Sequence, residues 1–299
     1  MAYRIDLEAP LAAELRRVAA DQLGSAVAGL EAAGARDRAA AVHGARKSVK
    51  KTRALLRLAR PGLPRDVYRD EQDALRAAGR LLSGARDADV LGATVDGLAE
   101  RSDGRLPAPQ FNGLRRAVGT QARADGAEDR SAEALAALRA IAARLAALPL
   151  DDVDAAALRN GAVRVQRAGA KRYKAARRSG GGAPMHELRK RAKDRWYHER
   201  LLRDGWPAIG KAYAGEADRL GELLGDEHDL AVLDERLARR GGELRTRADL
   251  GVVRALIAER RAELAAEALA LGRRLYGEKP KAYGRRLAAG LRAADAVAA

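Results

Sequence analysis

Two stretches of this chain combine a histidine with closely spaced lysine and arginine residues, a composition suited to binding phosphate oxygens. The first, residues 43–60, holds seven basic residues and no acidic one. Guanidinium and ammonium groups hold phosphate through charge-assisted hydrogen bonds. On a helix, one face of this stretch would be basic and the opposite face apolar. The basic face consists of His43, Arg46, Lys47, Lys50 and Arg57. It would rise ~21 Å, enough to contact several successive phosphates of a linear polyanion.

The second stretch, residues 186–203, repeats the first in altered form 143 residues later. The matched positions are His43 and His186, Arg46 and Arg189, Lys47 and Lys190, and Lys50 and Lys193. A third row of basic residues steps along the chain by three and four positions, which places its members on one helical face. This row consists of Arg164, Arg167, Lys171, Lys174 and Arg178. The recurrence predicts an anion-binding site with more than one wall.

The elements that position these rows are predicted to be helices. Alanine, leucine, arginine and glutamate dominate the chain, β-branched alternation is missing, and proline or glycine clusters recur at helical intervals. The sequence therefore predicts an all-α fold. The expected helices span roughly residues 8–33, 38–60, 65–82, 87–101, 109–125, 131–147, 154–178, 185–204, 206–223, 228–240, 247–274 and 280–297.

A second motif indicates an internal repeat. Residues 82–91 align with residues 224–233 at an offset of 142, nearly the offset of the basic stretches. Two anchors at almost one spacing predict two pseudo-symmetric helical bundles. The expected division is an N-terminal repeat over residues 1–148 and a C-terminal repeat over residues 149–299.

Within this second motif, two aspartates precede predicted helices. Asp87 and Asp229 are expected to cap helix N-termini, where a carboxylate accepts hydrogen bonds from free amides. Arg86 and His228 precede them at matching positions. Either of these two could turn toward the basic site.

Composition limits the class of protein. The chain has 299 residues, of which 47% are hydrophobic, so it can bury a sizeable core. Its 57 basic and 41 acidic residues give a formal net charge of +16, which favours a polyanionic partner. The absence of cysteine excludes disulfides and fits a reducing compartment. Because neither a leader-like segment nor a membrane-length apolar run is found, we expect a cytoplasmic protein without membrane contact.

The paired motifs together resemble the CHAD domain, the conserved histidine α-helical domain. The resemblance rests on HxxRK from His43, LxGxRDxDVL at residues 82–91, HxLRKxxKxxxY from His186 and LGDxHDLAVL at residues 224–233. It extends over roughly residues 4–294. The resemblance implies two pseudo-symmetric helical bundles around a basic central cavity. It also implies binding of inorganic polyphosphate and association with polyphosphate granules.

This sequence departs from the family pattern at four positions. Ser83 stands where the first turn usually has glycine, and Lys47 where valine is frequent. Asp194 and Trp196 occupy positions of the second basic helix where the family pattern leads us to expect arginine. These departures alter individual contacts rather than the resemblance as a whole.

The candidate polyphosphate-binding residues come from the three basic rows and the second motif. They are His43, Arg46, Lys47, Lys50, Lys51, Arg53, Arg57, Arg86, Arg167, Lys171, Lys174, Arg178, His186, Arg189, Lys190, Lys193, Tyr197 and His228. For Tyr197, a hydroxyl contact with phosphate and packing against a neighbouring helix both remain open. We expect His198 to be peripheral, and Trp196 and Trp206 to be core or interface aromatics.

Other classes of function are less well supported by the sequence. No phosphate loop and no acidic cluster among the basic rows are found, so we expect neither an enzyme nor a bound cofactor. A metal site formed by His43, His186, His228 and Asp229 is disfavoured by the surrounding positive charge. Nucleic acid is the stronger alternative, because its phosphates would suit the same rows. However, aromatic residues make up only 3% of the chain. An acidic protein partner also remains open, and the oligomeric state is not indicated.

Overall fold

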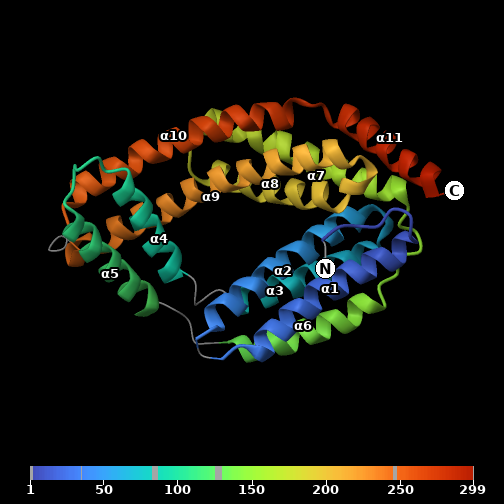
Figure 1. The fold of residues 1–299 in the computed structure, drawn as a ribbon, viewed down its shortest axis with the longest axis horizontal. Helices are drawn as coiled ribbons and strands as arrows, with labels where there is room; N and C mark the ends of the chain where they lie inside the picture. The colour runs from blue at the N-terminus through green and yellow to red at the C-terminus, as the bar shows by residue number, and fades with distance from the viewer. Residues whose placement is uncertain (1–2, 35, 83–86, 125–129, 245–247, 299) are drawn as a thin grey trace.

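The computed structural model of this chain describes residues 3–34, 36–82, 87–124, 130–244 and 248–298. Within these ranges it contains eleven α-helices, two short 3₁₀ helices and no strand, which confirms the all-α prediction (Figure 1). The α-helices are α1 (Leu11–Ala32), α2 (Arg38–Ala59), α3 (Arg65–Leu81), α4 (Asp87–Glu100), α5 (Ala108–Ala124), α6 (Ser131–Ala146), α7 (Ala155–Ser179), α8 (Ala183–Leu201), α9 (Pro207–Leu244), α10 (Leu250–Gly277) and α11 (Pro280–Ala298). The 3₁₀ helices are η1 (Arg60–Gly62) and η2 (Arg203–Gly205). None of the helices in the described ranges is both long and apolar enough to cross a membrane.

Helix α9 corrects one prediction. Two helices were expected over residues 206–240, with a break near Gly225, but the structure has one continuous helix of 38 residues. A glycine inside a helix costs only about 1 kcal/mol. Burial of Leu224 and Leu230 on either side of it outweighs this cost. Asp229 therefore lies inside α9, and its prediction as an N-terminal cap is wrong.

Asp87 and Arg86, which match Asp229 and His228 in the first half of the chain, are described only in part by the structure. Helix α4 does begin at Asp87, as predicted. The side chain of Asp87 and the whole of Arg86 lie outside the described residues, so their predicted roles stay predictions.

The buried side chains form two hydrophobic cores. The first gathers α1, α2, α3 and α6 with parts of α7, α8 and α11. The second gathers α4, α5, α9 and α10 with the remaining parts of α7 and α8. In Figure 1, α4 and α5 lie at the opposite end of the long axis from α11. Helices α7 and α8 thus belong to both cores and join them.

Helices α4 and α5 precede residue 148 but pack in the second core. Leu91 of α4 and Leu114 of α5 are buried there among residues of α9 and α10. The division of the chain into repeats 1–148 and 149–299 stays a prediction from the sequence motifs. The two hydrophobic cores do not coincide with these two repeats, because α4 and α5 of the first repeat pack in the second core.

Helix α7 crosses the end of α2 at very short range. A Cβ atom built on Gly161 of α7 would overlap the carbonyl oxygen of Leu58 in α2. A Cβ on Gly62 of η1 would lie 2.6 Å from the carbonyl oxygen of Asp152, just before α7. Glycine at these two positions therefore lets the backbones meet, and the crossing holds the basic row of α7 beside the end of α2.

Candidate anion-binding surface

Helices α2 and α8, which carry the two related basic stretches, are joined by a buried polar contact. His198 of α8 is 1% exposed, and its Nε2 donates to the carbonyl oxygen of Ala54 in α2 at 2.9 Å. Burial lowers the pKa of His198 to about 4, so its ring is neutral near pH 7. The prediction of a peripheral His198 is therefore wrong. Helical periodicity predicts on which side of α8 the His198 side chain lies, but it cannot show that α2 packs against that side.

Asp194 forms the second part of this joint. Its carboxylate accepts from Nη1 of Arg57 at 3.0 Å and lies 3.0 Å from Nη2 of Arg191. Asp194 itself is buried. One of the departures from the family pattern thus binds two arginines of adjacent helices. We refer below to the contacts of His198 and Asp194 with α2 as the α2–α8 joint.

The basic face of α2 is partly exposed and partly used in packing. His43, Lys47 and Lys50 are exposed. Arg46 is half-buried, and its Nη1 donates to the carbonyl oxygen of Leu82 at 2.8 Å. The outer part of the row is therefore open to a ligand, whereas Arg46 also holds the end of α3.

Two further cations of α2 are held against the protein. The ammonium of Lys51 lies 5.1 Å from the ring centroid of Tyr3, and burial lowers the pKa of Lys51. Nε of Arg53 donates to Oε1 of Gln72 at 3.2 Å, and Gln72 donates back to the Arg53 carbonyl at 2.8 Å. Burial lowers the pKa of Arg53 to about 10. These side chains position α2 as well as adding positive charge.

A histidine pair lies where α8 packs against α9. The ring centroids of His186 and His228 are 4.4 Å apart, so the structure brings two predicted residues together across 42 positions of the sequence. Burial and then the charge of His228 lower the pKa of His186. Burial and then the charge of Arg189 lower the pKa of His228. Both shifts favour the neutral rings, and an anion that offset the nearby positive charge would favour their protonation.

Arg189 stands beside this histidine pair. Its Nη2 would lie 3.5 Å from a Cβ atom on Gly225 of α9, an ordinary contact distance, so the guanidinium packs directly against α9. Nε of Arg189 and Nδ1 of His186 are buried and have no hydrogen-bond partner among the described residues. Buried polar atoms normally have a partner, which marks this corner as a place for a ligand or water.

The remaining cations of the α8 row are paired with carboxylates. Nζ of Lys190 lies 2.6 Å from Glu187, and Nζ of Lys193 lies 3.0 Å from Asp218 of α9. Lys190 is exposed, and Lys193 is half-buried. Since these carboxylates are partly exposed, a polyanion could displace them at low cost.

The aromatic residues near α8 differ in their surroundings. Tyr197 is buried in an edge contact with Tyr3, at 5.8 Å between ring centroids, and burial raises its pKa to about 12. The packing alternative for Tyr197 is therefore the one that the structure contains. Trp196 packs against both cores, as predicted. Trp206 is 51% exposed, so of its two predicted alternatives the core position is wrong and the interface position stays a prediction.

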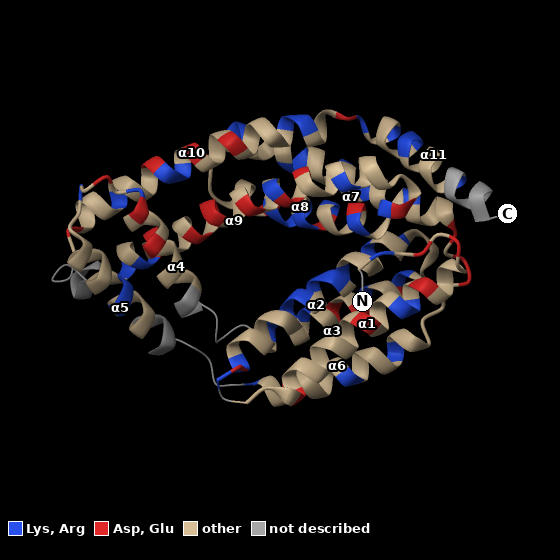
Figure 2. Cartoon of the chain, in the orientation of Figure 1, with Lys and Arg blue, Asp and Glu red and all other residues tan. Residues whose placement is uncertain are grey.

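The α7 row lies along the outer side of its helix. Its five members, Arg164, Arg167, Lys171, Lys174 and Arg178, are all exposed. None of them makes an ion pair with a residue that the structure describes. Figure 2 shows basic residues on α7 and α8 and, in the neighbouring layer, on α2.

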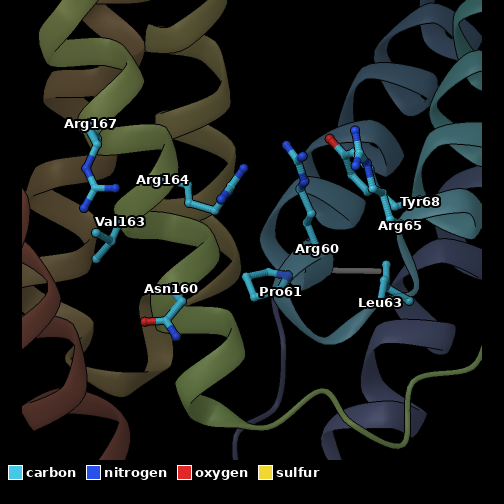
Figure 3. A pocket seen from close by; sticks show the side chains of 9 residues that line it. All are labelled: Arg60, Pro61, Leu63, Arg65, Tyr68, Asn160, Val163, Arg164 and Arg167. Carbon is cyan, nitrogen blue, oxygen red and sulfur yellow. The ribbon is translucent and has the colours of Figure 1, made fainter.

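Two members of the α7 row border a pocket. Together with Arg60 and Arg65, which flank the turn between α2 and α3, they line a volume of about 500 Å³, and Arg164 extends toward Arg60 (Figure 3). Sequence reasoning counted Arg60 as basic but did not include it or Arg65 among the site residues. No sequence signal connects residues 60–65 with α7, because only the close crossing at Gly161 brings them together.

A metal site is not formed by the residues considered for it. Across the described ranges, no group of three or more histidine, aspartate or glutamate side chains is arranged to hold a metal ion. His186 and His228 are adjacent, but their other charged neighbours include Arg189 and Lys190.

Comparisons with known proteins give the family and the fold. Residues 10–238 match the family model of the CHAD domain. Among solved structures, the chain is similar to the crystal structure of the CHAD domain from the plant Ricinus communis, with a TM-score of 0.61 and 21% sequence identity. The similarity covers 98% of this chain and 95% of the plant chain, and at this identity it concerns the fold. No curated protein sequence matches the chain.

Proposed function

Because this chain belongs to the CHAD domain family, we propose that it binds inorganic polyphosphate along the basic faces of α2 and α8. The observation that carries the proposal is the α2–α8 joint. It places two basic rows, which are 143 residues apart in the sequence, on helices in direct contact. A linear polyanion needs cations in series, and adjacent rows supply them.

Exposed and half-buried cations would contribute to binding in different ways. His43, Lys47 and Lys50 are exposed along α2 and can meet successive phosphates. Arg189 and His186 are half-buried beside α9 and carry the unpaired polar atoms. Hydrogen bonds to charged groups contribute roughly 1.5–3 kcal/mol each, so a few such contacts suffice for tight binding.

We propose binding rather than catalysis. Two carboxylates near the two rows are already engaged by cations of the protein: Asp194 by Arg57 and Arg191, and Asp218 by Lys193. Phosphoryl transfer requires carboxylates that can hold metal ions or orient a nucleophile. The neighbouring basic groups compete for that role here.

Nucleic acid remains the second candidate, and Trp196 argues against it. One way to bind single strands is to stack bases on exposed aromatic rings. The Trp196 ring is approached by Lys193 at 4.5 Å and by Arg200 at 5.2 Å from its centroid. These cations compete with a base for the ring. We therefore expect long-chain polyphosphate to displace an equal number of phosphate equivalents of single-stranded RNA or DNA, and the opposite ranking would favour the nucleic-acid function.

The direct test removes three exposed or weakly paired lysines together. Calorimetry with long-chain polyphosphate should show weaker binding by the variant Lys47→Ala, Lys50→Ala, Lys190→Ala. Its salt dependence should fall by about two units of the logarithmic slope, at ~0.7 per lost contact as for single-stranded nucleic acid. The matched control, Arg273→Ala, Arg274→Ala, Lys281→Ala, removes the same charge from exposed positions on α10 and α11. Equal losses in both variants would show that net charge alone drives binding.

The cellular part of the proposal follows from the ligand. We propose that the protein is cytoplasmic and associates with polyphosphate granules. A fluorescent fusion of the full chain should colocalise with granules, and the triple lysine variant should be diffuse. Colocalisation of that variant at wild-type levels would separate granule association from the α2 and α8 rows.

A further inference from the structure

The pocket between the α2–α3 turn and α7 is lined by arginines from both sides. Arg60 and Arg65 come from the turn, and Arg164 and Arg167 come from α7. In Figure 3, Arg164 extends from α7 toward Arg60, with Pro61 below them. The volume of about 500 Å³ falls within the range of about 300–1,000 Å³ that is usual for small-molecule sites.

The charge in this pocket is uncompensated. No acidic residue lines it, and its four arginines make no ion pair with any residue that the structure describes. The guanidinium of Arg60 lies 4.7 Å from the ring centroid of Tyr68, which fixes its orientation through a cation–π contact. Elsewhere in the described chain many arginines are paired, such as Arg144 with Glu71 at 2.6 Å. Four unpaired guanidinium groups around one space create a strongly anion-attracting volume.

The backbones that carry the two sides of the pocket are held close together, although the four arginine side chains are exposed. The backbone crossing of Gly161 and Leu58 lies one helical turn from Arg164. Gly62 meets the residues before α7 and anchors the other wall. A ligand therefore has to order only the arginine side chains and not the backbone, which lowers the entropy cost of binding.

We propose that this arginine pocket is a second anion site, which takes a compact phosphate compound with several charges, of the pyrophosphate or tripolyphosphate class. Guanidinium forks on two facing walls can each bind phosphate oxygens in a bidentate manner. A bounded space of this size suits a short anion, whereas a long polymer requires a continuous row. Arg60 and Arg164 belong to the basic stretches of the sequence, but of the four arginines only Arg167 is among the candidate polyphosphate-binding residues. The pocket lies outside the α2 and α8 faces of the proposed function, so this site goes beyond it.

The test uses tripolyphosphate as the probe and calorimetry on the full chain. The pocket variant Arg60→Ala, Arg164→Ala should bind tripolyphosphate more weakly by roughly tenfold per arginine removed. The charge-matched control Arg273→Ala, Arg274→Ala should bind within about twofold of the unsubstituted protein, since both arginines are exposed on α10 and neither lines the pocket. Circular dichroism should show that all variants keep the helical signal.

Three results would overturn the pocket assignment. These are no binding of tripolyphosphate by the unsubstituted protein, equal losses in the pocket and control variants, and a loss only in the variant Lys47→Ala, Lys50→Ala, Lys190→Ala. The last result would place the short anion on the α2 and α8 rows. Loss of long-chain binding in that lysine variant, with tripolyphosphate binding intact, supports both sites. Failure of the unsubstituted chain to bind long polyphosphate would refute the proposed function but leave the pocket standing.

Discussion

Replacing Asp194 by asparagine tests how the protein holds two arginines inside the α2–α8 joint. The carboxylate lies 3.0 Å from a nitrogen of Arg57 and 3.0 Å from a nitrogen of Arg191, and its side chain is 9% exposed. Removing one partner of a fully buried ion pair costs about 3–5 kcal/mol. Because the two arginines keep side-chain exposures of 17% and 25%, solvent screens part of this loss. We expect the free energy of unfolding to fall by about 2–3 kcal/mol.

The same substitution should tighten polyphosphate binding while it weakens the fold. Asparagine leaves two guanidinium groups without a counter-charge next to the basic rows. A gain of about 1 kcal/mol would correspond to roughly fivefold higher affinity. Urea unfolding followed by circular dichroism gives the stability, and calorimetry gives the affinity.

Asp218→Asn serves as the comparison. Its carboxylate contacts Lys193 at 3.0 Å, but both side chains are about one-third exposed. Such pairs contribute only ~0–1 kcal/mol, so this variant should lose little stability. If Asp194→Asn loses no more stability than Asp218→Asn, the α2–α8 joint does not depend on its carboxylate, and the reasoning is refuted.

Three other predictions concern backbone packing and protonation. Gly161→Ala should lower the melting temperature strongly, because its Cβ would overlap the backbone of α2. Gly97→Ala is the control: it has open space around it and should stabilise helix α4 by about 0.5–1 kcal/mol. Equal effects of the two substitutions would contradict the close crossing of α7 and α2. Since burial lowers the pKa of His198 to about 4, the unfolded state binds more protons between about pH 6.5 and 4, and up to about 3 kcal/mol of stability should be lost as the pH falls through that range. His198→Leu should show a flatter stability profile, and an unchanged profile would contradict the role of this ring. Polyphosphate should bind more tightly as the pH falls below the usual histidine range, because an anion favours protonation of His186 and His228. Replacing both histidines by glutamine should make the affinity depend less on pH. An unchanged pH dependence would show that the histidine pair does not take part in binding.

The helical architecture could be predicted because local signals and tertiary packing agree over most of the chain. Proline after α2 and alanine-rich, leucine-rich segments elsewhere placed most helix ends within a few residues. The exception, α9, has a glycine and four acidic or polar residues at its centre, which locally favour a turn. Burial of leucines on both sides decided in favour of helix, and that burial depends on α8 and α10 rather than on the local sequence.

The candidate site was predictable in its residue types but not in its partners. Periodicity identified exposed cations such as Lys47 and Lys50. It could not show that His198 would meet Ala54, a contact across 144 residues. Nor could it show that Arg60 and Arg164 would face one pocket. Such pairings are set by the crossing of helices, for which a single sequence carries no periodic signal.

The different surroundings of the two tryptophans give the protein an intrinsic optical reporter. Trp206 is exposed and lies outside the basic rows, so its emission should respond to added quencher but not to ligand. Trp196 is packed between the two cores and is touched by the cations of Lys193 and Arg200. An anion that draws these cations away changes the electric field at the Trp196 indole. Fluorescence of the unlabelled chain can therefore report events at the cations beside Trp196, none of which lines the arginine pocket.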